Sequence, residues 1–350
     1  MDLERWINRL LKAMGVFFAL VIATLVGLIF YAYHFLPKVA PADETLKIEA
    51  TPARLKRGKY LAQHVAGCMG CHSHRDFNVY GEPVIPGTEF EGGEPLFTEV
   101  IGLPGELPPP NLTPYNLGRY SDGELVRVIR TGVRKNGEPL FPFMPYQHYA
   151  HMTQADLDSV IVYLRSLPSI KNDVPDHHLE PPLGVIVRTI PKDAGPYPAP
   201  VDPKQTVAYG RYLVTLGACM DCHSPVDGHH HPIPGMDFAG GMEIPYFNSR
   251  YQRNPQGGVL RVPNITPDKD TGIGAWTRAD FIARFAAWRG KKGLAKEKRL
   301  DLDKGDYVEL MPYLEYSGMT DADLGAIYDY LRSVAPVRNK VVKFTPPKAL

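Results

Sequence analysis

The sequence predicts a mainly α-helical protein in which one type of small domain occurs twice behind a single N-terminal transmembrane helix. Three observations support this fold class: a long apolar run near the N-terminus, a Cys-x-x-Cys-His pentapeptide that occurs twice, and matching segments around both copies. A length of 350 residues fits two domains with accessory segments. The 34 prolines and 32 glycines indicate long loops between few helices, and no long alternating strand pattern is present.

The apolar run covers residues 13–33 and is interrupted only by glycines and one threonine. At a rise of 1.5 Å per residue it spans about 32 Å as a helix, which is enough to cross a bilayer. Arg5, Arg9 and Lys12 precede it, so the positive-inside rule predicts a cytoplasmic N-terminus and export of the chain beyond Leu36. A cleaved signal peptide is the alternative. The bulky residues that follow the run do not form a small-x-small cleavage site, which favours a retained anchor.

The repeated pentapeptide contains every cysteine of the chain. Its two copies are Cys68-Met69-Gly70-Cys71-His72 and Cys219-Met220-Asp221-Cys222-His223. This spacing is typical of c-type haem attachment, in which two thiols bind the haem covalently and the histidine takes one axial position of the iron. A zinc knuckle would need a second Cys or His pair nearby, and a thioredoxin-like site would need a βαβ context. Neither is present, so the sequence predicts two covalently bound haem c groups.

The segments that flank the two pentapeptides match in order and spacing. Each copy carries, in turn, a Tyr-Leu pair before the haem motif, an Ile-Pro-Gly loop ending in Gly-Gly, an Asn-x-Thr-Pro stretch and a Met-Pro-Tyr stretch. The predicted organisation is an N-terminus and anchor over 1–36, a linker over 37–50, domain 1 over 51–170, a proline-rich linker over 171–204, domain 2 over 205–338 and a C-terminal tail over 339–350.

Helix signals agree between the two copies. The expected N-terminal caps are Thr51, Ser121, Thr153, Thr277 and Thr320, and Gly132 and Gly290 are the expected ends of the middle helices. Gly58 and Gly210 lie inside the first helices, where glycine costs about 1 kcal/mol relative to alanine. We expect a close crossing with the last helix of each domain to require them.

These motifs resemble those of membrane-anchored dihaem c-type cytochromes, and are similar to the cytochrome c subunits of bacterial alcohol, aldehyde and gluconate dehydrogenases. The resemblance covers about residues 51–335 and rests on both haem motifs, the Asn-x-Thr-Pro stretches, the Thr271–Trp276 segment and the two Met-Pro-Tyr…Met-Thr-x-x-Asp-Leu endings. It implies two class-I cytochrome c folds. The chain departs from many such subunits in having two haem motifs rather than three, and in having Tyr120 where the second copy has Trp276.

Each haem iron also needs a sixth ligand or an open site, and this choice separates a carrier from an enzyme. Met144 and Met311 lie in loops before proline, on no apolar helix face, and we predict that they are the axial ligands. Met152 and Met319 stand just before a helix cap, where a packing role as a hydrophobic staple is expected. His148 and His151 have no counterparts in the second copy and are expected at the surface.

The predicted function is electron transfer between a dehydrogenase or quinol-oxidising complex and a terminal oxidase or soluble cytochrome, on the periplasmic side of a bacterial inner membrane. No general base, nucleophile or substrate pocket is evident, and no enzyme activity is expected. Two alternatives stay open: a dihaem oxidoreductase of the peroxidase or thiosulfate dehydrogenase type, and a haem-bearing subunit within a respiratory supercomplex. A net charge of +1 does not favour nucleic acid. The basic stretch over 291–299, present only in the second copy, is a candidate docking surface for a redox partner.

Overall fold

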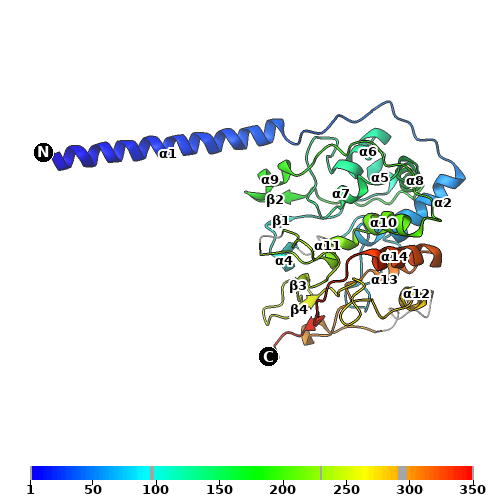
Figure 1. Ribbon diagram of the computed structural model, residues 1–350. Helices are drawn as coiled ribbons and strands as arrows, with labels where there is room; N and C mark the ends of the chain where they lie inside the picture. The colour runs from blue at the N-terminus through cyan, green and yellow to red at the C-terminus, as the bar shows by residue number, and fades with distance from the viewer. Residues whose placement is uncertain (1, 95–97, 229–230, 291–297, 349–350) are drawn as a thin grey trace.

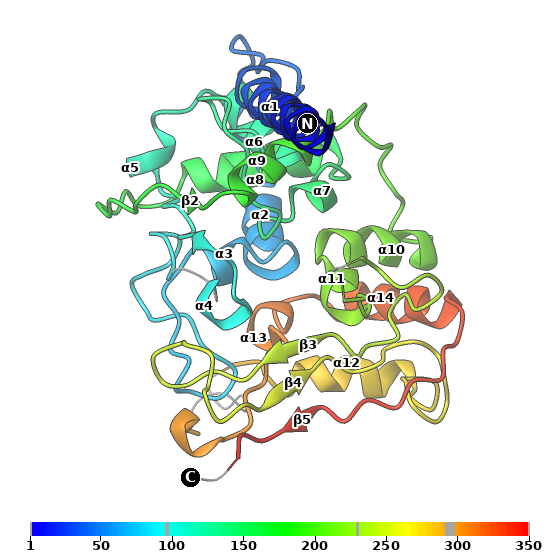
Figure 2. The ribbon, with the colours of Figure 1, turned by 90° about the vertical axis from the view of Figure 1, so that its left-hand side faces the viewer.

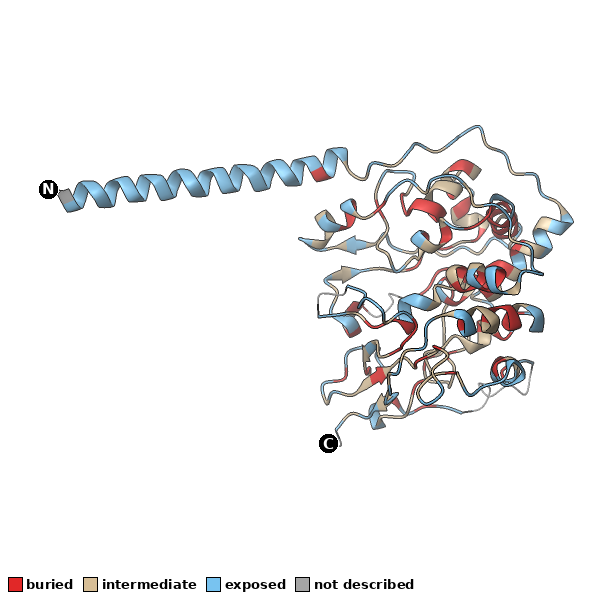
Figure 3. Ribbon diagram, viewed as in Figure 1, coloured by how far each residue is buried: buried red, intermediate tan, exposed pale blue. Residues whose placement is uncertain are grey.

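The computed structural model describes residues 2–94, 98–228, 231–290 and 298–348. It is mainly helical, as the sequence predicts, with a few short strands. Helix α1 (Asp2–Phe35) projects from a body formed by the rest of the chain, and nearly all of it is exposed (Figures 1 and 3). The segment Leu3–Phe35 is long and apolar enough to cross a membrane, with a mean hydropathy of 2.6 in its most apolar window. Membrane anchors and signal sequences share this length and composition.

The first half of the body, residues 51–170, is organised by two crossing helices, α2 (Pro52–Tyr60) and α8 (Gln154–Arg165). α2 runs into a π-helical turn, η1 (Leu61–Val65), and then into the short helix α3 (Cys68–Cys71). α6 packs against α8. The remaining helices of this half are α4 (Thr98–Ile101), α5 (Pro114–Leu117), α6 (Asp122–Thr131) and α7 (Tyr146–Tyr149).

In the second half, residues 205–338, the first helix, the motif helix, the middle helix and the last helix recur in the same order. α10 (Thr206–Leu216) crosses α14 (Asp321–Ser333), and α11 (Cys219–His223) follows α10 as α3 follows η1. The middle helix α12 (Arg278–Ala286) packs against α14, and α13 (Tyr313–Tyr316) precedes it. One set of helix contacts therefore occurs twice along the chain.

Short antiparallel sheets and a linker complete the body. β1 (Gly105–Glu106) pairs with β2 (His178–Leu179). β3, β4 and β5 form a second sheet in that order, at the end of the body far from α1 (Figure 2). The bounds of the remaining elements are β3 (Glu243–Pro245), β4 (Val259–Arg261), β5 (Phe344–Thr345), α9 (Leu183–Ile186), η2 (Val187–Thr189) and η3 (Leu302–Lys304).

The predicted helix starts are confirmed. The five caps Thr51, Ser121, Thr153, Thr277 and Thr320 each accept a hydrogen bond from the backbone N–H three residues further on. Gly132 ends α6 in the left-handed conformation, with φ 71°. The predicted end of the matching helix at Gly290 is wrong, because α12 stops at Ala286 with Ala287 as its C-cap.

The two glycines inside the first helices are explained by backbone contact, as predicted. A Cβ on Gly58 would lie 1.8 Å from the carbonyl oxygen of Ser159 in α8. A Cβ on Gly210 would lie 1.9 Å from the carbonyl oxygen of Ala326 in α14. Since any side chain would collide with a backbone oxygen, only glycine permits these crossings.

A single hydrophobic cluster runs through both halves and draws mainly on the crossing helices, where the buried residues concentrate (Figure 3). Leu61, Leu157, Leu213 and Leu324 are fully buried in it. A second cluster joins α4 of the first half to the strands of the second half; its members are Val100, Tyr246, Phe247, Leu260, Leu300, Leu302 and Val308. The two halves therefore share two apolar cores, so packing as well as the linker joins them.

Reciprocal polar contacts also join the halves. The Tyr212 hydroxyl of α10 donates to Asp156 at the start of α8, with an O–O distance of 2.6 Å. The Tyr60 hydroxyl of α2 donates to Asp323 at the start of α14. Within the first half, Arg57 donates two further hydrogen bonds to Asp156, of 2.8 and 2.9 Å, and so holds the carboxylate that Tyr212 contacts. Each half thus binds the start of the other half's last helix with a tyrosine of its own first helix.

Candidate haem centres

The first Cys-x-x-Cys-His motif is folded as one short helical turn. Gly67 enters it with φ 65°, and the N–H of His72 donates to the carbonyl of Cys68 over 3.0 Å. In a helical turn, residues three apart lie on the same side. Cys68 and Cys71 are therefore presented together, with His72 directly after them, as c-type attachment requires.

The imidazole of His72 is held in one tautomer by the backbone. Its Nδ1 lies 2.8 Å from the carbonyl oxygen of Pro110. Because a carbonyl only accepts hydrogen bonds, Nδ1 carries the proton and Nε2 keeps its lone pair for a metal. Burial lowers the pKa of His72 to about 4, so the ring is neutral near pH 7.

A cavity of 370 Å³ opens beside this turn. Cys68, Cys71 and His72 form part of its wall, and Met144 and Met152 form another part. Most of the rest is apolar, and is supplied by residues 107–112, by α6, by α7 with the loop before it, and by residues 172–177 at the start of the linker. The cavity is within the usual size range of cofactor sites and combines a concave apolar lining with few polar groups. The residues present fit a haem c, with two thiols and a neutral imidazole on one wall and methionine sulfur within the same lining.

The second motif repeats this local geometry. α11 presents Cys219, Cys222 and His223 in the same order. Nδ1 of His223 lies 2.8 Å from the carbonyl oxygen of Pro263, and burial, with a smaller effect of the Lys343 charge, lowers the pKa of His223 to about 4. Met311 and Cys219 both pack against the shared hydrophobic cluster. The donor set therefore fits a second haem of the same kind.

The Asn-x-Thr-Pro stretches support the histidines from behind. Asn111 accepts hydrogen bonds from the N–H and hydroxyl of Thr113 at 2.8 and 2.7 Å, and Asn264 accepts the same pair from Thr266 at 2.8 Å each. These bonds fix the turn whose preceding proline carbonyl holds the histidine. In the sequence these stretches stand out only as repeats, and their hydrogen bonds behind the histidines are seen only in the fold. The sequence feature that could have indicated this role is the proline before each asparagine, which occurs in both copies.

The methionine loops are tied to the haem motifs of their own halves. The Tyr149 hydroxyl, five residues after Met144, donates to the carbonyl of Ala66. The Tyr316 hydroxyl, five residues after Met311, donates to the carbonyl of Gly217 over 2.8 Å. Each predicted axial methionine is therefore anchored to the chain just before the cysteines that it would face.

Met152 and Met319 are both deeply buried and pack in the shared hydrophobic cluster, as expected for packing residues. Met152 also lines the first cavity. His151 is exposed, as predicted. His148 is not a free surface residue: its Nε2 lies 2.7 Å from a carboxylate oxygen of Asp221, inside the second haem motif. The sequence could not show this contact because it joins the two halves.

The two haem motifs face each other across the contact between the halves. The pKa of the Cys222 thiol is raised to about 11 by burial, with further effects from Asp221 and from Cys71 of the first motif. On the reciprocal side, a Cβ on Gly70 would lie 2.8 Å from a carboxylate oxygen of Glu315 in α13. The covalent attachment points of the two haems would thus be neighbours.

The predicted basic docking stretch lies mostly outside the described residues, which resume at Lys298. The backbone carbonyl of Lys298 accepts a hydrogen bond from the N–H of Tyr80 at 2.9 Å. The ammonium group of Lys298 lies 5.6 Å from the centre of the Tyr80 ring. Tyr80 in turn stacks on Trp288, with ring centres 5.5 Å apart. The end of the basic stretch therefore packs on the loop that follows the first haem motif.

No family model matches the sequence. The chain is 29% identical over 303 residues to the cytochrome c subunit of an alcohol dehydrogenase (quinone) from Gluconacetobacter polyoxogenes, across 83% of this chain and 58% of that protein. It is 27% identical over 304 residues to the gluconate 2-dehydrogenase cytochrome c subunit of Pantoea cypripedii, across 78% and 62%. It is 28% identical over 211 residues to a diheme cytochrome c-type protein of Cereibacter sphaeroides, across 58% and 64%. The chain thus spans less than two thirds of each of these relatives. The resemblance predicted from the motifs, to cytochrome c subunits of dehydrogenases, is confirmed.

Proposed function

We propose that this chain is an electron-transfer protein that binds two haem c groups covalently and serves a dehydrogenase as its cytochrome subunit. The observation that carries the proposal is the repeated donor set: two cysteines on one helical turn followed by a buried, neutral histidine whose Nδ1 is bound to a proline carbonyl. When bound, a haem supplies an iron that alternates between the ferric and ferrous states. The relatives are named as cytochrome subunits, which supports a carrier rather than a catalytic subunit.

The two halves are proposed to be class-I cytochrome c domains that arose by duplication, with boundaries at 51–170 and 205–338. The repeated helix crossing and the repeated histidine, asparagine and tyrosine hydrogen bonds support this reading. In domain 1, Cys68 and Cys71 would hold the haem covalently and His72 and Met144 would bind its iron. In domain 2 the corresponding residues are Cys219, Cys222, His223 and Met311.

The axial methionines are tested by replacing each with leucine, which keeps the volume but removes the sulfur. Ferric haem with a bound methionine sulfur has a weak absorption band at the red end of the visible spectrum. We expect Met144→Leu and Met311→Leu each to remove half of this band while haem content stays at two per chain. Met152→Leu is the matched control, since this methionine also lines the first cavity. Loss of the band in Met152→Leu instead would assign the sixth ligand to Met152.

The chain is further proposed to stay anchored in the bacterial inner membrane through α1, with both haem domains in the periplasm. The far end of α1 belongs to the folded body: Ala32 is buried, and the Arg188 guanidinium lies 4.4 Å from the centre of the Tyr33 ring. A signal peptide is removed and would leave Arg188 without this ring. The N-terminus of the purified protein should map at or near Met1, and the protein should stay with membranes after a high-salt wash. A soluble product that starts beyond Leu36 would refute the anchor.

The electron donor is proposed to be a dehydrogenase, and the acceptor a terminal oxidase or a soluble cytochrome. The facing haem motifs support transfer between the two haems, because each motif contacts the other half directly. Purification in mild detergent tests the partner. A dehydrogenase catalytic subunit should co-elute with the chain, whereas elution with a quinol-oxidising complex would place the chain in a respiratory supercomplex.

A further inference from the structure

We propose that the electron passes from the haem of domain 1 to the haem of domain 2, because equivalent segments beside the two sites carry opposite charge. This inference rests on the proposed function. The proposed function requires two haems, and the inference assigns the order in which the electron visits them. In the step, the first iron is oxidised from ferrous to ferric and the second is reduced from ferric to ferrous, with no proton transferred.

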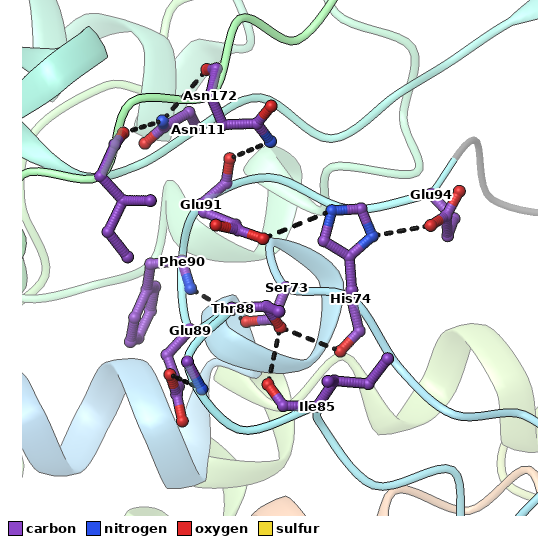
Figure 4. Close-up of polar contacts among 12 residues, drawn as sticks. Ser73, His74, Ile85, Thr88, Glu89, Phe90, Glu91, Glu94, Asn111 and Asn172 are labelled. Carbon is purple, nitrogen blue, oxygen red and sulfur yellow. Dashed lines mark hydrogen bonds and ion pairs between the residues drawn. The ribbon is translucent and has the colours of Figure 1, made fainter.

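The segments are those that follow the last helix of each half. Nδ2 of Asn111 donates to the carbonyls of Ile170 and Asn172 at 2.8 and 3.2 Å (Figure 4). Nδ2 of Asn264 donates to the carbonyls of Val337 and Asn339 at 2.8 and 3.4 Å. The segment after α8 is therefore held by the asparagine behind His72. The segment after α14 is held in the same way by the asparagine behind His223.

A second pair of hydrogen bonds shows which residues of the two segments correspond. The side chain of Asn172 donates to the carbonyl of Glu91 at 3.0 Å, one residue after the buried Phe90 (Figure 4). The side chain of Asn339 donates to the carbonyl of Ala239 at 3.0 Å, one residue after the buried Phe238. Asn172 and Asn339 are thus equivalent.

From this register, Asp173 corresponds to Lys340 and Asp176 to Lys343. Lys171 and Arg338 are equivalent and both basic. Residues 170–178 contain one positive residue, Lys171, and two negative ones, Asp173 and Asp176. With histidines neutral, their net charge is −1. Arg338, Lys340 and Lys343 give residues 337–345 a net charge of +3.

Both segments lie close to the haem sites. Asp173 and Asp176 line the first cavity together with His72. Asn339, next to Lys340, donates to the carbonyls of Ala239 and Gly240, and the N–H of Gly240 donates to the carbonyl of His223 at 2.7 Å. Both segments therefore lie beside the residues that would hold the haems.

Two arginines compensate the two aspartates of the first site, so the charge difference between the sites comes mainly from the lysines of the second segment. Arg134 lines the first cavity, but it pairs with Asp176 at 2.8 Å and with Glu138 at 3.1 Å. Arg119 also lines this cavity and balances one aspartate. Near the second site, Asp270 lies 3.9 Å from the Arg338 guanidinium and offsets its charge, and Glu309, which accepts a hydrogen bond from the N–H of Met311 at 3.2 Å, opposes one of the two lysines.

The direction follows from Coulomb's law. Reduction adds an electron to the haem, so a nearby positive charge stabilises the ferrous state and a nearby negative charge destabilises it. The haem of domain 2 should therefore have the higher reduction potential and receive the electron. The four charged side chains, Asp173, Asp176, Lys340 and Lys343, are exposed. Salt should therefore weaken their effect on the two reduction potentials.

The test is a redox titration of the full-length, haem-loaded protein in detergent, comparing the wild type with Lys340→Glu/Lys343→Glu. We expect two one-electron steps in the wild type. In the variant the higher-potential step should fall, reducing the equilibrium constant for transfer between the haems at least about tenfold, which is about 59 mV. The shift should shrink as salt rises. The control is Lys192→Glu/Lys204→Glu, which makes the same charge change on the linker and should move neither step.

A complementary variant guards against misfolding of the first. Asp173→Asn/Asp176→Asn removes the two negative charges and should raise the lower-potential step alone. If a well-folded variant moves the other step, or moves neither, the proposed order is wrong. A wild type in which the two haems titrate together would overturn the proposed order, whereas a wild type that binds no haem would overturn the proposed function itself.

Discussion

Replacing Gly58 by alanine should separate α2 from α8 and destabilise the body. The added Cβ would lie 1.8 Å from the carbonyl oxygen of Ser159, whereas ordinary van der Waals contact begins at 3.4 Å, so the helices must move apart by about 1.6 Å. Overpacking of this kind costs about 1 to 3 kcal/mol, and the upper end applies here because a backbone oxygen cannot rotate away as a side chain can. Alanine recovers about 1 kcal/mol of helix propensity. We expect a net loss of about 2 kcal/mol.

The measurement is thermal unfolding of the haem-loaded protein, followed by circular dichroism. A loss of about 2 kcal/mol lowers the midpoint by about 3 °C, because the unfolding entropy of about 2.1 cal/mol/K per residue sums over the whole body that follows α1. Gly210→Ala should behave in the same way, since its Cβ would lie 1.9 Å from the carbonyl of Ala326. Gly27→Ala is the control, because it makes the same change inside α1 with nothing within 4 Å. If Gly58→Ala unfolds within 1 °C of the wild type, the close crossing described here is wrong.

Three further predictions concern stability. Tyr212→Phe removes a hydrogen bond to the carboxylate of Asp156 and should cost about 1.5 to 3 kcal/mol in chemical denaturation, with m unchanged. Thr51→Ala removes the cap of α2 and should cost about 1 kcal/mol in the same assay. Burial raises the pKa of Glu82 to about 7 despite its ion pair with Arg75. Because the folded protein then binds the proton more tightly than the unfolded chain, stability should fall by up to about 3 kcal/mol as pH rises from 4.5 to 7. Glu82→Gln should abolish most of that fall in thermal midpoints taken at pH 5 and pH 8.

The helix starts, the apolar N-terminal helix and the haem motifs could be predicted from the sequence because they depend on neighbouring residues. A cap such as Thr51 needs only the backbone three positions on, and a Cys-x-x-Cys-His turn needs only five residues. Repetition added long-range information. Two glycines at matching places in two helices indicated a close crossing with the last helix of each copy, and the structure confirms it.

What the repeat could not show is how one half meets the other. His148 was expected at the surface because it has no counterpart in the second half, yet it contacts Asp221 there. Tyr60 and Tyr212 bind the starts of helices in the opposite half, and no local pattern names those partners. The end of α12 was also misjudged, because Gly290 has the left-handed φ of a helix end but stands four residues beyond it.

The sequence by itself therefore predicted the proposed attachment cysteines, the proposed histidine ligands and the order of the main helices, since these follow from spacing within single segments. Only the tertiary structure decided which backbone oxygen orients each histidine, which methionines share a cavity with the first motif, and that the two motifs lie face to face. These features join residues 38 to more than 70 positions apart along the chain, such as His72 with Pro110 and His148 with Asp221. Such pairs come together only when both halves bury their apolar faces in one shared core, and burial is a property of the whole fold.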